Sequence, residues 1–280
     1  MDNASSDGTT TLVKTKYPSV RLIENASNLG FAAAANQGIR ASAGGFVLLV
    51  NPDISFAPGF VGALSKAFDE DPDAGAAAPK LVRPDGVTVD SAGLVMRRDR
   101  KAIDRGRDTR DDGSYDAPAR VFGACGAAAL YRRTMLDELA ADGEFFDESF
   151  FAYKEDVDLA WRANLLGWKT LYRPDAVATH GRGWKAGGGR SSVPRFIRRH
   201  SHKNRYLTII KDDDLSSILL HLPFILFYEL KLFVYALLFE PFLCLAYWDI
   251  IRLLPEMKRK RRAMEKMRRL SPKGVRALMG

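Results

Sequence analysis

A short apolar run, residues 46–50 (FVLLV), ends at Asn51-Pro52-Asp53 and sets the fold class that this chain can adopt. Its length suits a strand buried on both faces of a mainly parallel sheet, because helix-compatible segments lie on either side. Side chains that follow such a strand lie at the carboxyl edge of the sheet, where open α/β folds bind ligands. The sequence therefore predicts an α/β domain with an acidic site at this edge.

Other segments fit the same alternation of strands and helices, and no internal repeat is present. Strands are predicted at 20–24, 74–81, 121–131 and 170–177, and helices at 31–43, 58–68 and 156–166. Residues 97–118 are charged, contain glycine and have little apolar periodicity, which indicates a surface loop or excursion.

Asn51 and Asp53 place one amide and one carboxylate at the predicted sheet edge. Mg²⁺ and Mn²⁺ prefer oxygen ligands and commonly bridge a few protein groups to substrate phosphates. The same tripeptide is also an ordinary turn after a strand. Taken alone, the motif leaves both interpretations open.

A second acidic group follows an aromatic segment that ends at Tyr153. Glu155, Asp156 and Asp158 stand at the start of a predicted helix, where carboxylates oppose the helix dipole, and Asp158 can pair with Arg162 one turn on. Aromatic rings beside a carboxylate also suit a sugar-binding pocket, in which the carboxylate takes a proton from an acceptor hydroxyl. A structural and a catalytic role are both compatible with this pattern.

His180 follows a predicted strand and precedes a glycine-rich basic loop that begins at Arg182. Glycines give such a loop backbone freedom, and its cations can neutralise a diphosphate. Imidazole is a common ligand of divalent transition metals. For this histidine a ligand role and a structural role remain equally open.

Taken in order, these elements resemble family 2 glycosyltransferases with a GT-A fold, especially the rhamnosyltransferase-like branch. The matching segments are DNASSDGT (2–9), NLGFAAAANQGI (28–39), FVLLVNPD (46–53), GACGAAALYRR (123–133), FFAYKEDVDLAWRANLLGW (150–168) and YRPDAVATHGRG (172–183). Each segment is weak evidence alone, and the first reads as a turn or frayed tail. Their order over residues 2–214 makes the resemblance specific.

The resemblance implies an inverting, single-displacement transfer of a sugar from a nucleotide-diphospho-sugar, assisted by Mg²⁺ or Mn²⁺. Asp2 matches the acid that contacts the nucleobase, and Asp53 matches the metal-binding acid of the D-x-D motif. Asp156 matches the catalytic base, and His180 matches the histidine that helps to hold the metal and the diphosphate.

The remaining site residues are assigned from the same resemblance. Glu155 is expected to support catalysis, whereas Asp158 and Tyr153 are expected on the acceptor side. Asn28, Asn51 and Arg182 complete the expected donor site.

The sequence departs from the family pattern in two places. Asn51 stands at the first position of the D-x-D motif, so metal affinity is expected to depend more on Asp53 and His180. The opening strand, helix and second strand of the family are absent, and Met1 stands where the family has an aliphatic residue, typically valine. We expect them to be encoded upstream, with an internal GTG valine codon read as the initiator; an in-frame stop just upstream would contradict this. The donor pocket of the chain as given is expected to be incomplete.

The character of the sequence changes at residues 215–254, which are rich in leucine and aromatic residues. Their longest stretch without a charged residue is fourteen residues, at 215–228, and a membrane-spanning helix needs about 18–20. We interpret 212–280 as a helical tail that lies in or dips into a bilayer surface, attached to a glycosyltransferase domain at 1–211. A buried helical hairpin and a true membrane span are the alternatives.

The net charge of +8 belongs to this tail, because residues 255–280 hold ten Lys or Arg and two acids. This distribution argues against a globally basic nucleic-acid-binding protein. A helical stripe at Met257, Met264, Met267 and Leu270 lies among these cations, as in helices that bind anionic lipids, although a merely solvated basic tail is the alternative.

Two distant cysteines fit a reducing compartment, and no signal peptide opens the chain as given, so we expect the cytosolic membrane face. The resulting hypothesis is a transferase that adds a sugar, such as rhamnose, to a glycan or lipid-linked acceptor of the cell envelope. The competing hypothesis is a catalytically inactive, membrane-bound fragment or interaction module.

Overall fold

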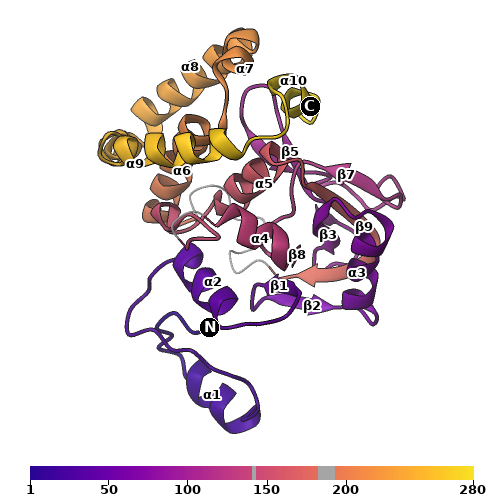
Figure 1. Cartoon of the computed structure of the whole chain (residues 1–280). Helices are drawn as coiled ribbons and strands as arrows, with labels where there is room; N and C mark the ends of the chain where they lie inside the picture. Colours follow the sequence, from indigo (N-terminus) through magenta and orange to yellow (C-terminus); the bar gives the residue numbers. More distant parts are fainter. Residues whose placement is uncertain (141–142, 182–192) are drawn as a thin grey trace.

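The computed structural model describes residues 1–140, 143–181 and 193–280, and it is built around one seven-stranded sheet (Figure 1). The strand order is β1 (Phe46–Val50), β8 (Ala128–Arg132), β3 (Ala74–Val82), β9 (Lys169–His180) and β2 (Ile54–Phe56), with β4 (Val89–Ser91) paired to β3 and β7 (Ala119–Val121) paired to β9. The α/β class is confirmed. The sheet is mixed rather than mainly parallel, because within the described chain only β3 and β9 pair in parallel and β8 runs antiparallel between β1 and β3.

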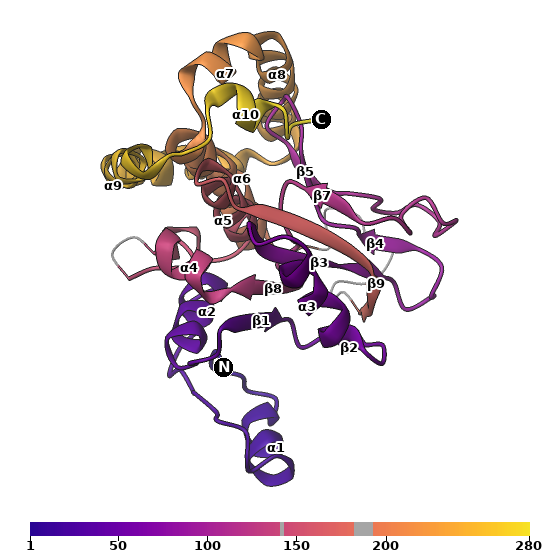
Figure 2. The same ribbon diagram turned by 45° about the vertical axis from the view of Figure 1, so that its right-hand side comes forward.

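Helices cover both faces of this sheet (Figure 2). The covering helices are α2 (Phe31–Arg40), α3 (Phe60–Glu70), α4 (Arg133–Leu139) and α5 (Glu155–Leu165). Alternate residues of β3 face opposite sides, so Ala77 packs with Leu64 of α3, whereas Ala76 belongs to the cluster around Met135 and Trp161 of α4 and α5. Two apolar cores thus hold the sheet between layers of helices.

The expectations at the N-terminal side are only partly met. The predicted strand 20–24 is wrong, since only Glu24 forms an isolated bridge, to Asp2, and no described strand lies beside this segment to extend the pairing. The preceding helix α1 (Thr9–Lys16) buries none of its residues. Strand β1 lies at the edge of the sheet, so Phe46 is 45% exposed and the strand is not buried on both faces as predicted.

Two segments in the middle of the chain also differ from expectation. The region 97–118, predicted as a loop, contains β6 (Ala102–Asp104), which forms a hairpin with β5 (Leu94–Met96). The predicted strand 121–131 is divided into β7 and β8 by a glycine-containing loop, 122–127. That loop reaches the candidate site.

The C-terminal helices gather on one side of the sheet, opposite α1 in both views (Figures 1 and 2). They are α6 (Arg195–Asp212), α7 (Leu215–Leu220), α8 (Leu222–Phe239), the short 3-10 helix η3 (Pro241–Cys244), α9 (Leu245–Met267) and α10 (Pro272–Arg276). Helix α9 packs along α6, where Met257 joins Phe150 and Leu207 in a shared cluster.

Two members of the predicted methionine stripe have a different role from the one predicted, whereas Met267 is 38% exposed. Met257 and Met264 are buried against the protein and do not face lipid, and Met264 lies in the same cluster as Trp161 of α5. The periodicity correctly indicated an apolar face, but Met257 and Met264 pack against α5 and α6. Residues beyond 212 thus complete its core.

Candidate active site

The acidic turn after β1 and the histidine at the end of β9 are brought together by strand pairing. Strand β2 starts directly after Asp53 and runs antiparallel to β9, with Ile54 opposite His180. The backbone N–H of Gly181 donates to the carbonyl of Asp53 over 2.8 Å. As a result, His180 Nε2 lies 3.4 Å from Asp53 Oδ2.

Asp90 fixes the orientation of this histidine and was not recognised from the sequence. It lies on β4, is fully buried, and its Oδ2 is 2.7 Å from His180 Nδ1. A carboxylate accepts hydrogen bonds, so Nδ1 carries a proton toward Asp90, and the ring is held with Nε2 toward Asp53. Asp90 stands between Val89 and Ser91 in the sequence, and nothing in this short segment indicated its partner.

This arrangement fits a divalent cation. His180 Nε2 and Asp53 Oδ2 face each other at 3.4 Å, and an imidazole oriented by a buried carboxylate is the common form of a metal ligand. The described residues contain no group of three or more His, Cys, Asp or Glu side chains that could hold a metal ion. Asp53 and His180 would therefore hold the ion together with oxygens of a bound diphosphate.

Asp156 is fixed in the first turn of α5 by two backbone N–H groups. Gly126 donates to Oδ2 over 2.9 Å and Val157 donates to Oδ1 over 2.8 Å. The residue after Gly126, Ala127, accepts a hydrogen bond from the N–H of Asn51 over 2.8 Å. Two consecutive residues of the loop 122–127 thus join the predicted base to the predicted metal-binding motif.

Burial makes Asp156 a stronger base than an exposed aspartate. It raises the pKa of this half-buried carboxyl above the usual value, although the hydrogen bond from Gly126 opposes the shift. Desolvation also raises the pKa of the Cys125 thiol, and the charges of Asp104, Asp156 and Asp90 add to that effect. The charges of Asp156 and Asp90 thus act on the same loop residue.

Glu155 is more deeply buried than Asp156, with 6% of its surface exposed. Burial, and after it the charge of Asp156, raises the pKa of Glu155 to about 8. This residue is therefore neutral at physiological pH and does not repel the charge on Asp156. Burial also lowers the pKa of Lys154.

The shifted pKa of Glu155 predicts how stability depends on pH. Folded Glu155 keeps its proton up to about pH 8, whereas the unfolded residue loses it near the ordinary value of 4.5. This contribution is therefore complete below pH 4.5 and is lost as pH rises through 8, by roughly 5 kcal/mol in total. Glu155→Gln should flatten this decline in thermal unfolding curves. An unchanged slope in the variant would contradict the assignment.

The turn before α5 has an unusual backbone. Phe151, Tyr153 and Lys154 have φ values of 65°, 70° and 72°, in the left-handed region that favours glycine. Each such residue costs on the order of 1–3 kcal/mol and persists only where its surroundings enforce it. Gly30 is part of those surroundings, because a Cβ there would lie 2.6 Å from both the ring and the carbonyl oxygen of Phe151.

The residues expected to bind the donor lie near the N-terminus of α2, in hydrogen-bonded loops. Asp2 is buried and accepts a hydrogen bond from the N–H of Ser5, whose hydrogen bonds lower the pKa of Asp2. The Oδ1 of Asn28 accepts from Asn3 Nδ2 and from the N–H of Gly30. Both residues thus have clear structural roles, and their donor contacts remain predictions. Arg182 lies outside the described residues.

The two residues expected on the acceptor side differ in accessibility. Tyr153 is 40% exposed on the strained turn, as an acceptor contact requires. Asp158 is fully buried and pairs with Arg162 and Lys211, so the helix-pairing interpretation describes it and the acceptor assignment does not. Its burial follows from helical geometry, which turns it away from the face that carries Asp156.

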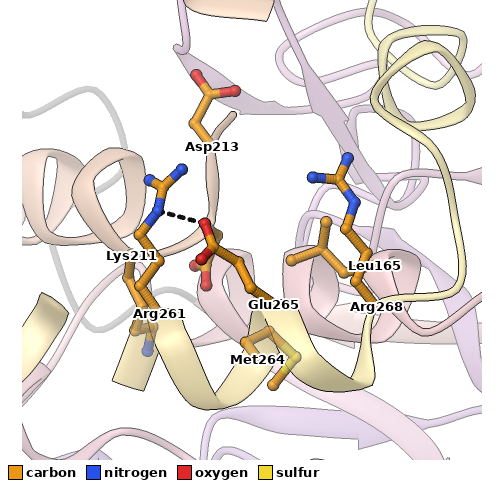
Figure 3. A pocket seen from close by; sticks show the side chains of 8 residues that line it. Leu165, Lys211, Asp213, Arg261, Met264, Glu265 and Arg268 are labelled. Atoms are coloured by element: carbon orange, nitrogen blue, oxygen red, sulfur yellow. Dashed lines mark hydrogen bonds and ion pairs between the residues drawn. The ribbon is translucent and has the colours of Figure 1, made fainter. Parts of the chain in front are cut away.

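The pocket in Figure 3 lies where α9 meets the end of α6, and Lys211, Arg261 and Arg268 are among its lining residues. None of the candidate catalytic or metal-binding residues lines it. Asp156 instead lines a second small pocket, together with Tyr131 and Leu159.

Sequence comparison gives the class of protein to which this fold belongs. Residues 1–140 match the family model described as glycosyl transferase family 2. The chain belongs to the family 2 glycosyltransferases, and the resemblance seen in its motifs is confirmed.

Individual relatives agree with this assignment. The N-acetylglucosaminyl-diphospho-decaprenol L-rhamnosyltransferases of two Mycobacterium tuberculosis strains are 30% identical over 236 residues, covering 74% of this chain and 72% of the relative. The crystal structure of GalNAc-T7 with UDP, GalNAc and Mn²⁺ is similar with a TM-score of 0.52 at 15% identity. The match covers 74% of this chain and 39% of that one, and it confirms the GT-A fold.

Proposed function

We propose that this chain transfers a deoxyhexose such as rhamnose, with inversion, from a nucleotide-diphospho-sugar to a lipid-linked acceptor at the cytosolic membrane face. The observation that carries the proposal is the link through Gly126 and Ala127. It places a carboxylate of raised pKa, Asp156, beside the turn that holds Asp53. The similar mycobacterial enzymes are named for an acceptor in which a sugar is joined through a diphosphate to decaprenol, which supports the lipid-linked class.

In this mechanism the chain's own residues handle a proton and orient a leaving group. Asp156 takes the proton of the acceptor hydroxyl as that oxygen bonds to the anomeric carbon, on the face opposite the departing diphosphate. Neutral Glu155 adds no negative charge beside the base. Asp53 and His180 would hold a divalent cation, which when bound stabilises the negative charge of the diphosphate.

Asp90 provides a test of the metal site that is independent of turnover. Asp90→Asn removes the carboxylate that orients His180, and the affinity for Mn²⁺ in the presence of a nucleoside diphosphate should fall by roughly 10–100-fold. Isothermal titration calorimetry measures this directly. Asp116→Asn is a suitable control, since Asp116 is an exposed acid that pairs with Lys80. Equal affinities for all three proteins would remove the histidine from the proposed site.

The membrane part of the proposal is supported by the two faces of α8. Among the described residues, α8 alone is long and apolar enough to cross a membrane, with 18 residues and a mean hydropathy of 1.8. One face touches α6, where Arg205 pairs with Glu229 and the hydroxyl of Tyr206 donates to Glu229. The opposite face is exposed and consists mainly of apolar side chains, namely Phe224, Leu226, Phe227, Leu230, Phe233, Val234, Leu237 and Leu238.

This two-sided character favours a helix that lies in the membrane surface over one that crosses it. A crossing helix would carry the Glu229–Arg205 pair, at its middle, into hydrocarbon. Further exposed apolar side chains flank α8 in the neighbouring elements: Leu215, Leu219, Leu220, Leu245, Trp248 and Ile251. Exposed cations of α9, such as Arg262 and Lys266, are available to anionic headgroups.

Replacing Phe227, Leu230 and Leu238 together by Glu should weaken binding to vesicles by at least about tenfold, because each change places a charge on the apolar face. Co-sedimentation with phosphatidylcholine vesicles containing about 30% phosphatidylglycerol measures it. Val61→Glu, at an exposed apolar position of α3, is the matched control. Unchanged binding of the triple variant would show that α8 does not contact lipid.

The function itself is tested by a donor screen with the full chain, Mn²⁺ and a lipid-diphosphate acceptor in vesicles. Labelled deoxyhexose should appear in the lipid fraction only when its nucleotide-diphospho-sugar is supplied. If no nucleotide sugar gives transfer or hydrolysis, the alternative of a non-catalytic membrane-bound module is the correct one.

A further inference from the structure

The strained turn before α5 is held mainly from outside, by helix α6. Within 151–154, three non-glycine residues adopt left-handed φ values, and Lys154 is the N-cap of the helix that carries Asp156. The cap residue makes no side-chain hydrogen bond to that helix. The conformation of the turn must therefore be imposed by its neighbours.

Asn204 is the side chain that contacts this turn most extensively. Its Nδ2 lies 2.8 Å from the carbonyl oxygen of Phe150, 3.0 Å from that of Ala152 and 2.6 Å from that of Tyr153. The residue is fully buried, and its Oδ1 has no hydrogen-bond partner among the described residues. The amide thus acts toward the turn as a donor alone.

Other contacts reach Ser149, shortly before the turn, or the first residue of the turn, Phe151. Lys203 Nζ donates to the carbonyl of Ser149, one residue before those that Asn204 binds. The ring of Phe151 stacks on His200, and its carbonyl accepts from the N–H of Ala32. Of these groups, only the Asn204 amide gathers several carbonyl oxygens from successive parts of the turn at one point.

We propose that Asn204 is a positioning residue for the transfer reaction. By drawing three carbonyl oxygens toward one amide, it stabilises the left-handed conformation from which α5 begins, and so fixes the direction in which Asp156 points. The inference rests on the proposed role of Asp156 as base. Loss of this amide would let the turn relax and displace the carboxylate, and a misplacement of about 1 Å can lower a rate by roughly 100-fold.

The test compares two buried asparagines replaced by leucine, which has a similar shape and no donor. Asn204→Leu removes the contacts to the turn. Asn164→Leu removes two hydrogen bonds to carbonyl oxygens, those of Phe122 and Ala160, near the other end of α5. Asn204→Leu should lower kcat by roughly 10–100-fold with the donor KM within about threefold, whereas Asn164→Leu should keep kcat within about threefold. Equal losses of kcat in the two variants, or none for Asn204→Leu, would overturn the proposal.

A second readout does not depend on turnover. Hydrogen exchange of the backbone amides at 151–157 should be at least about tenfold faster in Asn204→Leu than in Asn164→Leu, because local opening of the turn becomes easier. No difference between the two variants would overturn the positioning role. If the exchange rates differ as expected but the wild-type chain transfers no sugar, the proposed function fails and the structural role of Asn204 stands. Should Asn204→Leu not fold, Asn204→Ser, which keeps a donor in a smaller side chain, is compared in the same two assays.

Discussion

The Asp156→Asn variant is expected to lose sugar transfer by roughly 10²–10⁴-fold while it still binds the nucleotide sugar. The amide keeps the size of the side chain and its acceptor oxygen, so the hydrogen bond from Gly126 can persist. What it lacks is the ability to accept a proton from the acceptor hydroxyl. The change should therefore appear in kcat rather than in the donor KM, as measured by release of nucleoside diphosphate in the presence of acceptor.

A neighbouring acid provides the control for this experiment. Glu148 lies in the short helix η1 (Glu148–Phe150) before the same turn and accepts hydrogen bonds from Asn36 and Arg40. Glu148→Gln should keep kcat within a few-fold, since this carboxylate has no part in proton transfer. Transfer by Asp156→Asn at the wild-type rate would show that another group is the base.

The second large effect is expected from Lys211, whose substitution should strongly destabilise the fold. Lys211 is 2% exposed at its side chain, lies 2.6 Å from Asp147 and also pairs with Asp158. Lys211→Met leaves both buried carboxylates without this cation. Removing one partner of a buried ion pair costs about 3–5 kcal/mol in free energy of unfolding. Urea denaturation at neutral pH measures the loss.

The pH of this measurement matters because of Asp147. Burial raises the pKa of its carboxyl, but attraction by Lys211 and Lys260 outweighs that effect and leaves the pKa well below the ordinary 3.8. A lowered pKa in the folded state means that this stabilisation is complete above pH 3.8 and is lost as the pH falls toward the folded pKa. Lys258→Met, at an exposed position of α9, should change the free energy of unfolding by less than about 0.5 kcal/mol. A loss below about 1 kcal/mol for Lys211→Met would contradict the expected role.

The parts of the fold that were predictable are those with a local signal. The run at 46–50 and the turn at Asp53 were recognisable because apolar length and a terminating Asn-Pro-Asp reflect short-range physics. The direction of β8 was not recognisable from the sequence. This strand lies antiparallel between β1 and β3, and that arrangement depends on contacts between residues distant in sequence. For the same reason Asp90 and Asn204 were missed, because each acts on a segment dozens of residues away.

The tail shows a different limit of sequence patterns. Helical periodicity at Met257 and Met264 identified a buried face correctly, but the same periodicity describes a helix packed on lipid and one packed on protein. In the structure this face packs on protein, because Met257 shares a cluster with Leu207 of α6. Helix α8 differs from α9, because its apolar face is not covered by protein and remains exposed.

Helix α6 has one more consequence, for the choice of acceptor. Three successive residues of α6 reach in two directions: Asn204 binds the turn that leads to Asp156, whereas Arg205 and Tyr206 both bind Glu229 of α8. If α8 rests on the bilayer, this single helix sets the height of the carboxylate above the lipid plane. The enzyme would then select acceptors by the distance between the reactive hydroxyl and the lipid surface. An acceptor whose hydroxyl is one sugar too close to the lipid, or one sugar too far from it, would not reach the base, even if its ring fitted the site.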